Sequence, residues 1–501
     1  MTYKHVIDPI NRIEGDLAVE IEVDANNKIS NAKCMGFVYR GFENIFIGKK
    51  PFDAMRLSTR ACGVCPISHG TVAAMAIESA ADFKIPRNAE LVRDIVLGSN
   101  IVVSHATHFY FMWAPDIVNE RYKESKLYPE MKKRLDPLKS EHLKTILKEA
   151  RIPLHTIVTM FGGKFPHPTH AVPGGVSLFN KDVDILKVKS ILKGVISTVE
   201  KQVLNGIPVA EVLKIKSVTD VLGLMKNEQF ANSDLGAFIQ YAQDIGLHNY
   251  GEGTAQKFLS AGWGHLGEGN MLFKPGFVEN GKFTPFDQNQ IGEDTCHSYY
   301  ETEKDWRHPS AGVTVPEVRK TDAYSWIKAA RYAGKAVEVG PLARQVVNGN
   351  PLVLDLAKAF GINNFTRTLA RLYEVVAILA QVSNWLDEID TTKPFAYPFK
   401  EIQDGEGAGV YEAPRGTIGH WIKIKNSVVD RYQIITPTTL NCSPMDFKGQ
   451  HSACETALIG VQLKDKDSIL EAGQIVRSFD PCISCSIHAI SIKSKSPKSE
   501  T

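Results

Sequence analysis

The sequence lacks the features that mark several common classes of protein. Its 501 residues contain only eight cysteines, too few for a disulfide-stabilised scaffold. Lys and Arg number 58 and Asp and Glu 56, so a net charge of +2 gives no reason to expect nucleic acid as a partner. No apolar run reaches the ~18 residues of a membrane span. Residues 1–16 lack the apolar core of a secretory signal.

What remains is an ordinary globular composition, with 43% hydrophobic and 23% charged residues. A chain of this length buries about three-quarters of its extended surface on folding, so it needs no disulfides. No internal repeat, linker or shift in composition marks a domain boundary. We expect one domain over residues 1–488, followed by a polar, basic and Ser-rich tail, 489–501.

Hydrophobic patterning predicts a mainly α fold with α+β segments: a large helix-bundle core with small antiparallel sheets near the N- and C-terminal regions. Apolar and polar residues alternate over 17–23, as in a half-buried strand, and a partner strand starts at Ile29. Residues 421–425 and 428–434 resemble a hairpin across Asn426 and Ser427. The glycine-rich stretch 250–282 lacks a βαβ context and is expected to be an irregular loop. Helical spacing predicts helices near 69–83, 88–115 with Asn88 as N-cap, 137–150, 182–203 and 364–388.

Four of the eight cysteines form two Cys-x-x-Cys pairs near opposite ends of the chain, Cys62 with Cys65 and Cys482 with Cys485. A structural zinc site uses two such pairs, but normally within a few dozen residues. Thioredoxin-like chemistry needs a βαβ context, which neither pair has. Two unrelated buried pairs are the simplest alternative. Spacing alone leaves these interpretations open.

The residues around the pairs favour one shared metal site. Arg60 precedes the first pair, which comes just before a predicted helix whose N-terminal amides stabilise thiolates. A histidine follows each pair, His69 and His488, and Asp480 precedes the second. Soft thiolates suit nickel or iron and disfavour magnesium or calcium. Because the four thiolates carry a large negative charge that Arg60 offsets only in part, we expect more than one metal ion.

The two cysteine motifs together resemble those of the large subunit of [NiFe]-hydrogenases. The resemblance spans the chain and includes further motifs at residues 8–15, 40–43, 161–164, 166–168, 339–344, 412–416 and 437–439. In that family four thiolates hold nickel, and two of them bridge to an iron that carries carbon monoxide and cyanide. Carried over, Cys62 and Cys482 are terminal nickel ligands, while Cys65 and Cys485 bridge.

The resemblance implies a hydrogenase, an enzyme that cleaves H₂ heterolytically and reversibly into protons and electrons, here in the direction of uptake. The first proton acceptor is the sulfur of Cys482, and Glu14 matches the glutamate that passes the proton outward. Burial can raise a carboxyl pKa towards that of a thiol. Without the cysteine motifs, Glu14 is better explained as an exposed acid at the start of a strand. Arg415 matches the arginine over the open coordination position, where Asp480 can pair with it.

Further matches surround this centre. The resemblance makes His69 a hydrogen-bond partner of a bridging sulfur. Pro414 and Thr438 match groups around the diatomic ligands, with the Thr438 hydroxyl donating to a cyanide nitrogen. One position departs from the pattern, because Ser104 stands where many members carry an aspartate close to the arginine. In this the chain resembles the cytoplasmic uptake and sensor branch, so we expect a cytoplasmic protein, although large subunits can travel with a partner that carries an export signal.

The family also places Mg²⁺ or a second iron, Fe²⁺, near the C-terminus. Its protein ligands match Glu43, the carbonyl of Ile434 and His488. The chain has no cysteine motif left for an iron–sulfur cluster, so electrons must leave through a partner, which in this family is an iron–sulfur small subunit. We expect any membrane contact to come through partners.

We expect the C-terminal tail to be removed from the mature protein. Residues 489–501 include three lysines, which could not be buried beside His488 without stranding their charges. In the family, a maturation chaperone and a dedicated endopeptidase act on such precursors, and the cut here would fall between His488 and Ala489. A hydrogen sensor of the same family is the alternative function. Its large subunit typically ends at the last histidine, so the tail favours an enzyme that turns over.

Overall fold

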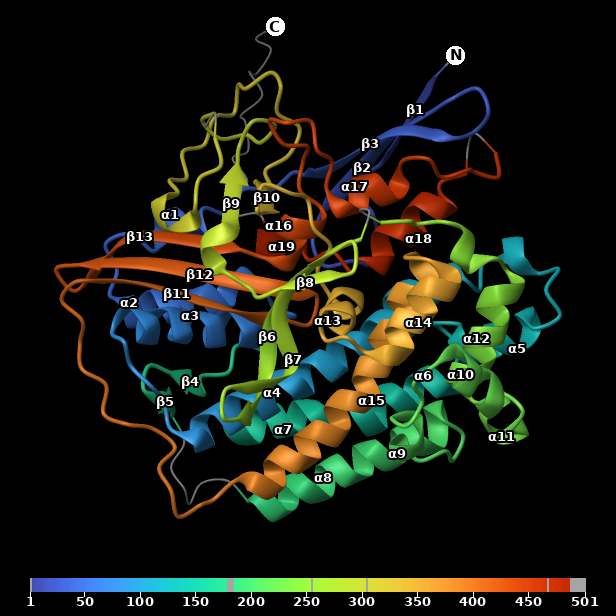
Figure 1. Cartoon of the computed structure of the whole chain (residues 1–501), viewed down its shortest axis with the longest axis horizontal. Helices are drawn as coiled ribbons and strands as arrows, with labels where there is room; N and C mark the ends of the chain where they lie inside the picture. The colour runs from blue at the N-terminus through green and yellow to red at the C-terminus, as the bar shows by residue number, and fades with distance from the viewer. Residues whose placement is uncertain (1, 178–183, 254–255, 303–304, 466–467, 487–501) are drawn as a thin grey trace, which may run out of the picture.

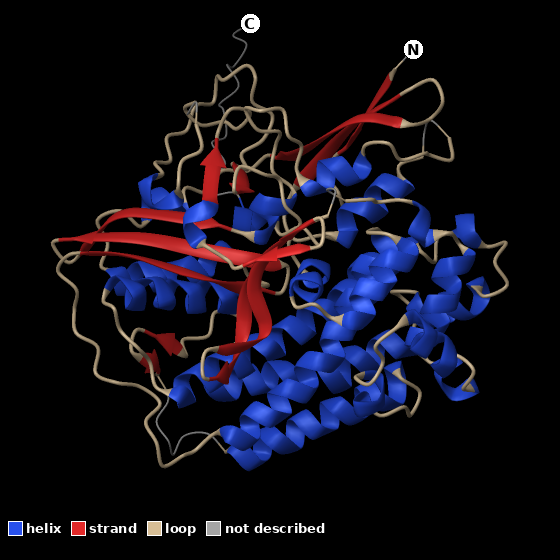
Figure 2. Cartoon of the chain, in the orientation of Figure 1, coloured by secondary structure: helices blue, strands red, loops and turns tan. Residues whose placement is uncertain are grey.

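The computed structural model describes residues 2–177, 184–253, 256–302, 305–465 and 468–486. Helix makes up 45% of the chain and strand 20%, and the strands form small antiparallel sheets (Figure 2). The helix content and the small antiparallel sheets agree in outline with the predicted fold. None of the helices in the described ranges is long and apolar enough to cross a bilayer.

Four helices pack against one another in the helical half of the molecule (Figure 1). Their bounds are α4 Arg87–Thr107, α7 Ile152–Gly162, α8 Ile185–Thr198 and α15 Asn364–Glu388. They share the largest apolar core of the chain. The predicted helix over 364–388 matches α15, which begins at a capping box between Asn363 and Thr366.

Two predicted helix boundaries were wrong. The helix α4 starts after Pro86, so Asn88 lies inside it, and its amide donates instead to the carbonyl oxygens of Asp390 and Lys393. The helix expected over 137–150 begins after the N-cap Ser140 and continues through a π-helical turn into α7.

Two sheets occur where the sequence predicts them. The N-terminal sheet contains β1 Tyr3–Ile7, β2 Leu17–Val23 and β3 Ile29–Gly36. The C-terminal sheet contains β11 Gly405–Ala413, β12 Gly416–Lys425 and β13 Val428–Ile435, and the β12–β13 turn falls at Asn426 and Ser427. The C-terminal sheet packs on α3, Pro66–Ala80. At Gly407 a Cβ would lie 2.3 Å from the Ala76 carbonyl oxygen, so glycine permits this close contact.

The glycine-rich stretch is not an irregular loop. It forms a third sheet in mid-sequence, from β6 Lys257–Gly267, β7 Asn270–Glu279 and β8 Lys282–Thr284. Gly262 and Gly264 both have positive φ, and a Cβ at Gly262 would lie 3.0 Å from the Pro275 nitrogen. These glycines interrupt the apolar alternation by which a strand is recognised, which is why sequence reasoning missed the sheet.

The other elements connect these layers. The helices are α1 Phe42–Ile45, α2 Pro51–Ser58, α5 Tyr128–Leu135, α6 Glu141–Ile146, α9 Val209–Val212, α10 Val218–Leu224, α11 Glu228–Ala231, α12 Asp234–Asp244, α13 Pro341–Val347, α14 Pro351–Phe360, α16 Pro437–Asn441, α17 Ala453–Leu458, α18 Leu470–Ser478 and α19 Ile483–Ser486. The short strands are β4 Ala171–Val172, β5 Gly175–Val176, β9 Ile291–Asp294 and β10 Ala329–Tyr332.

Candidate metal centre

The two cysteine pairs, which lie at opposite ends of the sequence, meet at one point. The sulfur atoms of Cys62, Cys65, Cys482 and Cys485 all lie within 4.8 Å of one another, and all four side chains are buried. The separation is 2.8 Å between Cys482 and Cys485, 3.0 Å between Cys65 and Cys485, and 3.4 Å between Cys62 and Cys482. Two unrelated buried pairs are thereby excluded. Among the described residues, no other group of three or more His, Cys, Asp or Glu ligand atoms converges in this way.

The surroundings favour the thiolate form at one cysteine of this cluster, Cys62. The Cys62 sulfur accepts hydrogen bonds from the backbone N–H groups of Val64 and Cys65, in the turn that leads into α3. Burial alone would keep the thiol protonated, but the other three thiols and the charge of Arg415 bring the pKa of Cys62 well below its usual range. The sequence suggested Arg60 as the compensating cation. The side chain of Arg60 is exposed, and the cation that lowers the pKa of Cys62 is the buried Arg415.

The N-terminal segment reaches the second cysteine pair by a close backbone contact. The N–H of Ile483 donates to the Glu14 carbonyl at 2.8 Å. Gly15 follows with φ of +81°, and a Cβ there would lie 2.9 Å from the Ser484 nitrogen. Glycine at this position therefore brings Glu14 against the turn that carries Cys482.

Glu14 is in direct contact with the cluster. The Cys482 thiol donates to its carboxylate at 3.1 Å, and the backbone N–H of Ser484 donates to the same oxygen at 3.1 Å. Burial and the negative charge of Cys62 raise the pKa of Glu14 in spite of these hydrogen bonds. Glu14 is partly buried, so the alternative of an exposed acid at a strand start is wrong.

Arg415 lies in the two-residue turn between β11 and β12. Its guanidinium is 3% exposed and forms an ion pair with Asp480, with 3.0 Å between Nε and Oδ1. Gly416, the next residue, has φ of +131°, and a Cβ there would lie 2.7 Å from the Gly340 nitrogen. Burial opposes the charge, yet Asp480 and the cysteine sulfurs raise the pKa of Arg415 well above its usual range. The arginine is a fixed cation beside the thiolates.

Two further predicted residues, His69 and Thr438, contact cysteines of the cluster, and a third, Pro414, precedes Arg415 in the chain. His69 Nε2 lies 3.4 Å from the Cys485 sulfur, and its Nδ1 lies 3.0 Å from Nε2 of His420. The Thr438 hydroxyl oxygen accepts the backbone N–H of Cys482 at 2.8 Å, which leaves its own proton available to a ligand. The carbonyl oxygen of Pro414 accepts a hydrogen bond from Arg344 at 3.1 Å.

Two of the three predicted ligands for a hard cation, Glu43 and Ile434, lie within the described residues. Glu43 is buried and accepts the backbone N–H of Ile434 at 2.9 Å. Its carboxylate also pairs with Lys328 at 3.0 Å. The third expected ligand, His488, lies outside the described residues, as does Ala489 and therefore the predicted cleavage point. Ser104 is buried in α4, and its hydroxyl has no hydrogen-bond partner within the described ranges.

Sequence reasoning missed several residues that hold the site together. Arg40 donates to the carbonyl oxygens of Arg60 and Ala61 at 2.8 and 2.6 Å, and to that of Ser484 at 3.4 Å, so it joins the two cysteine turns. His420 fixes the ring of His69. The motif around Arg40 was visible in the sequence, but no spacing rule pairs His420 with His69.

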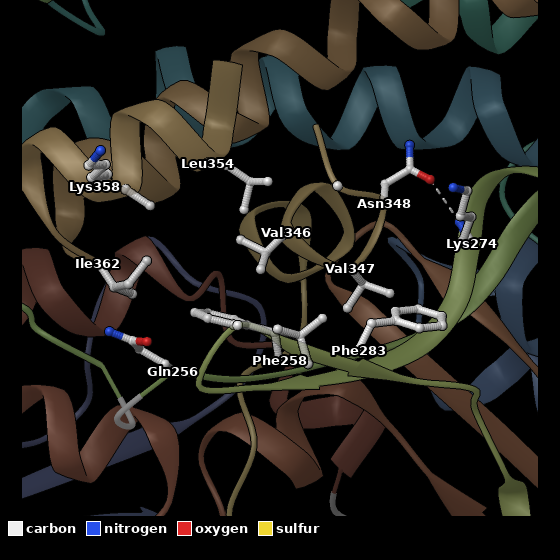
Figure 3. A pocket seen from close by; sticks show the side chains of 14 residues that line it. Gln256, Phe258, Lys274, Phe283, Val346, Val347, Asn348, Leu354, Lys358 and Ile362 are labelled. Carbon is white, nitrogen blue, oxygen red and sulfur yellow. Dashed lines mark hydrogen bonds between the residues drawn. The ribbon is translucent and has the colours of Figure 1, made fainter. Parts of the chain in front are cut away.

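A large crevice elsewhere does not belong to this site. It encloses about 620 Å³ between the β6–β8 sheet and the helices α13 and α14 (Figure 3). Its walls are mostly apolar, with Phe258, Val346 and Leu354 among them, and none of the described residues that line it is a Cys, His, Asp or Glu. It therefore offers no thiolate, imidazole or carboxylate ligand for a metal.

Four converging, buried cysteine sulfurs with an adjacent carboxylate and a fixed guanidinium form a candidate centre for soft, redox-active metals. Comparison with known proteins gives the family. Residues 40–123 and 140–488 match the family model described as nickel-dependent hydrogenase, and residues 4–35 match one described as HoxL-like. The chain belongs to the nickel-dependent hydrogenase family, as a large subunit with a nickel–iron active site.

Individual relatives align with nearly the whole chain. The periplasmic [NiFeSe] hydrogenase large subunit of Desulfomicrobium baculatum is 32% identical, with 97% of this chain and 94% of the relative aligned. The uptake hydrogenase large subunit of Cupriavidus necator is 27% identical over 97% of this chain and 95% of its own. The reduced Ni-Fe-Se hydrogenase structure from D. vulgaris Hildenborough superposes with a TM-score of 0.84 at 29% identity, covering 97% of this chain and all of that one. The relatives are hydrogenases, oxidoreductases that act on H₂, and the designation "large subunit" implies a small-subunit partner.

Proposed function

We propose that this chain cleaves H₂ reversibly into protons and electrons, working in the direction of uptake. The observation that carries the proposal is the contact between Glu14 and Cys482 within the four-cysteine cluster. When bound, a nickel–iron centre supplies the two-electron chemistry. The chain supplies its thiolate ligands, the route for the proton and the fixed charge beside it.

The proton route follows from the hydrogen bonds. Cys482 takes the first proton on its sulfur and hands it to the Glu14 carboxylate, to which that thiol already donates at 3.1 Å. Burial raises the pKa of the Glu14 carboxyl towards that of a thiol, so this group can accept the proton and release it again. The N–H of Ser484 holds the acceptor oxygen in place at 3.1 Å, so transfer needs little rearrangement.

Arg415 acts as a fixed positive charge over the reacting position. Although it forms an ion pair with Asp480, its Nε and Nη1 groups have no hydrogen-bond partner within the described ranges. A buried guanidinium of this kind polarises a neutral molecule beside it more strongly than it would in water. We assign Arg415 and Asp480 to orienting and polarising H₂ and Glu14 to moving the proton.

We also propose which residues hold each metal ion. Cys62 and Cys482 are proposed as terminal nickel ligands and Cys65 and Cys485 as bridges to an iron that carries carbon monoxide and cyanide. The free hydroxyl proton of Thr438 suits a cyanide nitrogen, and Pro414 lines that side. Mg²⁺ or Fe²⁺ is proposed at Glu43, the Ile434 carbonyl and His488.

Electrons leave through a partner in this proposal. All four residues of the two Cys-x-x-Cys pairs are in the metal cluster, so the iron–sulfur clusters are assigned to the small subunit. We place the enzyme in the cytoplasm because Ser104 replaces the acid that many family members carry. Since the Desulfomicrobium baculatum relative is named periplasmic, cell fractionation and the presence of a twin-arginine signal on the co-encoded small subunit test this placement.

An enzyme and a sensor differ in turnover. The purified complex of large and small subunits is supplied with H₂ and a viologen dye, and dye reduction is followed under anaerobic conditions. Sustained reduction at roughly 10 s⁻¹ or more, a typical enzyme rate, supports a turnover enzyme. Nickel-loaded complex that exchanges H₂ with D₂O but reduces dye orders of magnitude more slowly supports the sensor.

A further inference from the structure

A closed ring of buried polar side chains surrounds Arg415, and most of its members lie outside the site described above. The ring begins at Asp480, which uses Oδ1 for Arg415 and Oδ2 for Arg371 on helix α15. Arg371 donates to Asp480 at 3.2 Å and to the carbonyl oxygen of Ser478 at 3.3 Å. Asp480 has φ of +53°, and Arg371 thus holds an unusual backbone turn two residues before Cys482.

The ring continues one helical turn further along α15. His105 lies between the two α15 residues, with Nδ1 at 3.4 Å from Arg371 and Nε2 at 3.0 Å from Glu374. Because the guanidinium can only donate, Nδ1 must accept, and the ring proton sits on Nε2 facing the Glu374 carboxylate. Burial lowers the pKa of His105 to about 4, so the histidine stays neutral in this position.

Arg344 closes the ring on the other side of Arg415. Glu374 accepts two hydrogen bonds from the Arg344 guanidinium, at 3.0 and 2.6 Å. The same guanidinium donates to the carbonyl oxygens of Ala413 and Pro414 at 2.8 and 3.1 Å, the two residues that precede Arg415 in the β11–β12 turn. One face of α15 therefore fixes both the counter-ion of Arg415 and the backbone that carries it.

The charges of this group balance. Arg344, Arg371 and Arg415 are matched by Glu374, Asp480 and Glu412, the last of which accepts from Arg344 at 2.8 Å. All six side chains are at most 3% exposed. With His105 neutral, no charge in the ring is left over, and Ser104 beside it adds none. A buried network in which every charge is paired is rigid, because breaking any one pair strands an ion.

We propose that Arg371 and Glu374 are positioning residues that hold the Arg415 guanidinium above the metal-binding cysteines. They act through Asp480 on one side and through Arg344 on the other, without touching the cysteines themselves. The inference rests on the proposed function of Arg415. It predicts that small changes on α15 slow turnover at a fully loaded centre.

The test compares conservative variants in the purified two-subunit complex. R371K keeps the charge but loses the forked geometry, and E374D keeps the charge but withdraws the carboxylate by one carbon. R331K is the matched control, because Arg331 is also fully buried and pairs with Asp446 at 2.8 Å, and none of its hydrogen bonds within the described ranges reaches a metal-binding cysteine. Nickel content, kcat per bound nickel, the KM for H₂ and the infrared bands of the iron ligands are measured for each.

We expect R371K and E374D to bind nickel and to lose about 10- to 100-fold in kcat per nickel, as misplacement by about 1 Å does, with KM little changed. The infrared bands should shift, while R331K keeps the wild-type kcat and bands. In an R415K background, R371K should add little further loss, since both changes act on one guanidinium.

Wild-type kcat per nickel in R371K and E374D would overturn the positioning role, as would full additivity with R415K. Loss of nickel from both variants but not from R331K would assign the ring to assembly and also overturn it. A wrong proposed function gives a different result from a wrong positioning role, because in that case the wild-type complex itself would lack nickel or H₂-dependent dye reduction.

Discussion

The sulfur of Cys482 lies 3.1 Å from a carboxylate oxygen of Glu14, although 468 positions separate the two residues in the chain. The contact exists because the N-terminal segment runs beside the turn of the second cysteine pair, where Gly15 allows the backbones to touch. A proton released at the cysteine thus has an acceptor one hydrogen bond away. The contact makes the mechanism testable with single substitutions.

Glu14→Gln should stop proton transfer without emptying the site. Glutamine keeps the shape and one hydrogen-bond acceptor but cannot carry a titratable proton, so turnover and H/D exchange should fall by about 10²–10⁴-fold. Nickel content, measured on the same sample, should stay at the wild-type level. Asp16→Asn is the control, since this exposed acid two residues away should be dispensable. Wild-type exchange in nickel-replete Glu14→Gln would remove Glu14 from the mechanism.

Cys65→Ala should abolish nickel binding, because it removes one of the four converging sulfurs. Cys442→Ala removes a thiol that is equally buried but belongs to the apolar core beneath the N-terminal sheet. That variant should lose some stability and keep its nickel. Elemental analysis of both proteins checks the contrast, and equal nickel in the two would show that Cys65 is not a ligand.

Acid should destabilise the fold through its buried histidines. Burial lowers the pKa of His105 to about 4 and those of His108 and His170 to about 3. An unfolded histidine titrates near 6.5, so below about pH 6.5 the unfolded chain binds protons that the folded chain cannot. The free energy of unfolding is therefore unaffected by these groups above about pH 6.5, and it falls as the pH is lowered from there towards 3.

His170 gives the sharpest form of this pH test. Its ring is 1% exposed, and neither nitrogen has a hydrogen-bond partner within the described ranges. His170→Phe should remove up to about 1.4 kcal/mol per pH unit from the slope of unfolding free energy between about pH 6 and 4. The same substitution at the partly exposed His297 serves as control. An unchanged slope in His170→Phe would show that this ring is protonated in the fold.

The C-terminal tail should be absent from active enzyme. The intact mass of the nickel-loaded large subunit should correspond to a chain that ends at His488, and nickel-free precursor should retain residues 489–501. A variant truncated by a stop codon after His488 tests whether the tail is needed for loading. Full activity from a chain that still ends in Thr501 would make the tail a solvated extension.

The cysteine motifs could be interpreted from sequence because their chemistry is local: spacing, flanking charge and soft ligands are all visible in a few residues. Helix α15 was predictable for the same reason, because its apolar residues recur at helical spacing without interruption and a capping residue precedes it. The β6–β8 sheet was not, because glycines that permit close contacts replace the apolar residues of a strand pattern. The ring of Arg344, His105 and Glu374 was hidden too, since nothing in a sequence pairs charges that only the tertiary fold brings together.

The most direct test of the account is the metal content of the purified complex. We predict about one nickel for each large subunit, accompanied by iron, with infrared bands from carbon monoxide and cyanide, because four soft thiolates suit these metals. Removal of the nickel should abolish H₂-dependent dye reduction. Zinc alone in the four-cysteine site, with no nickel and no such bands, would contradict the assignment of a hydrogenase centre.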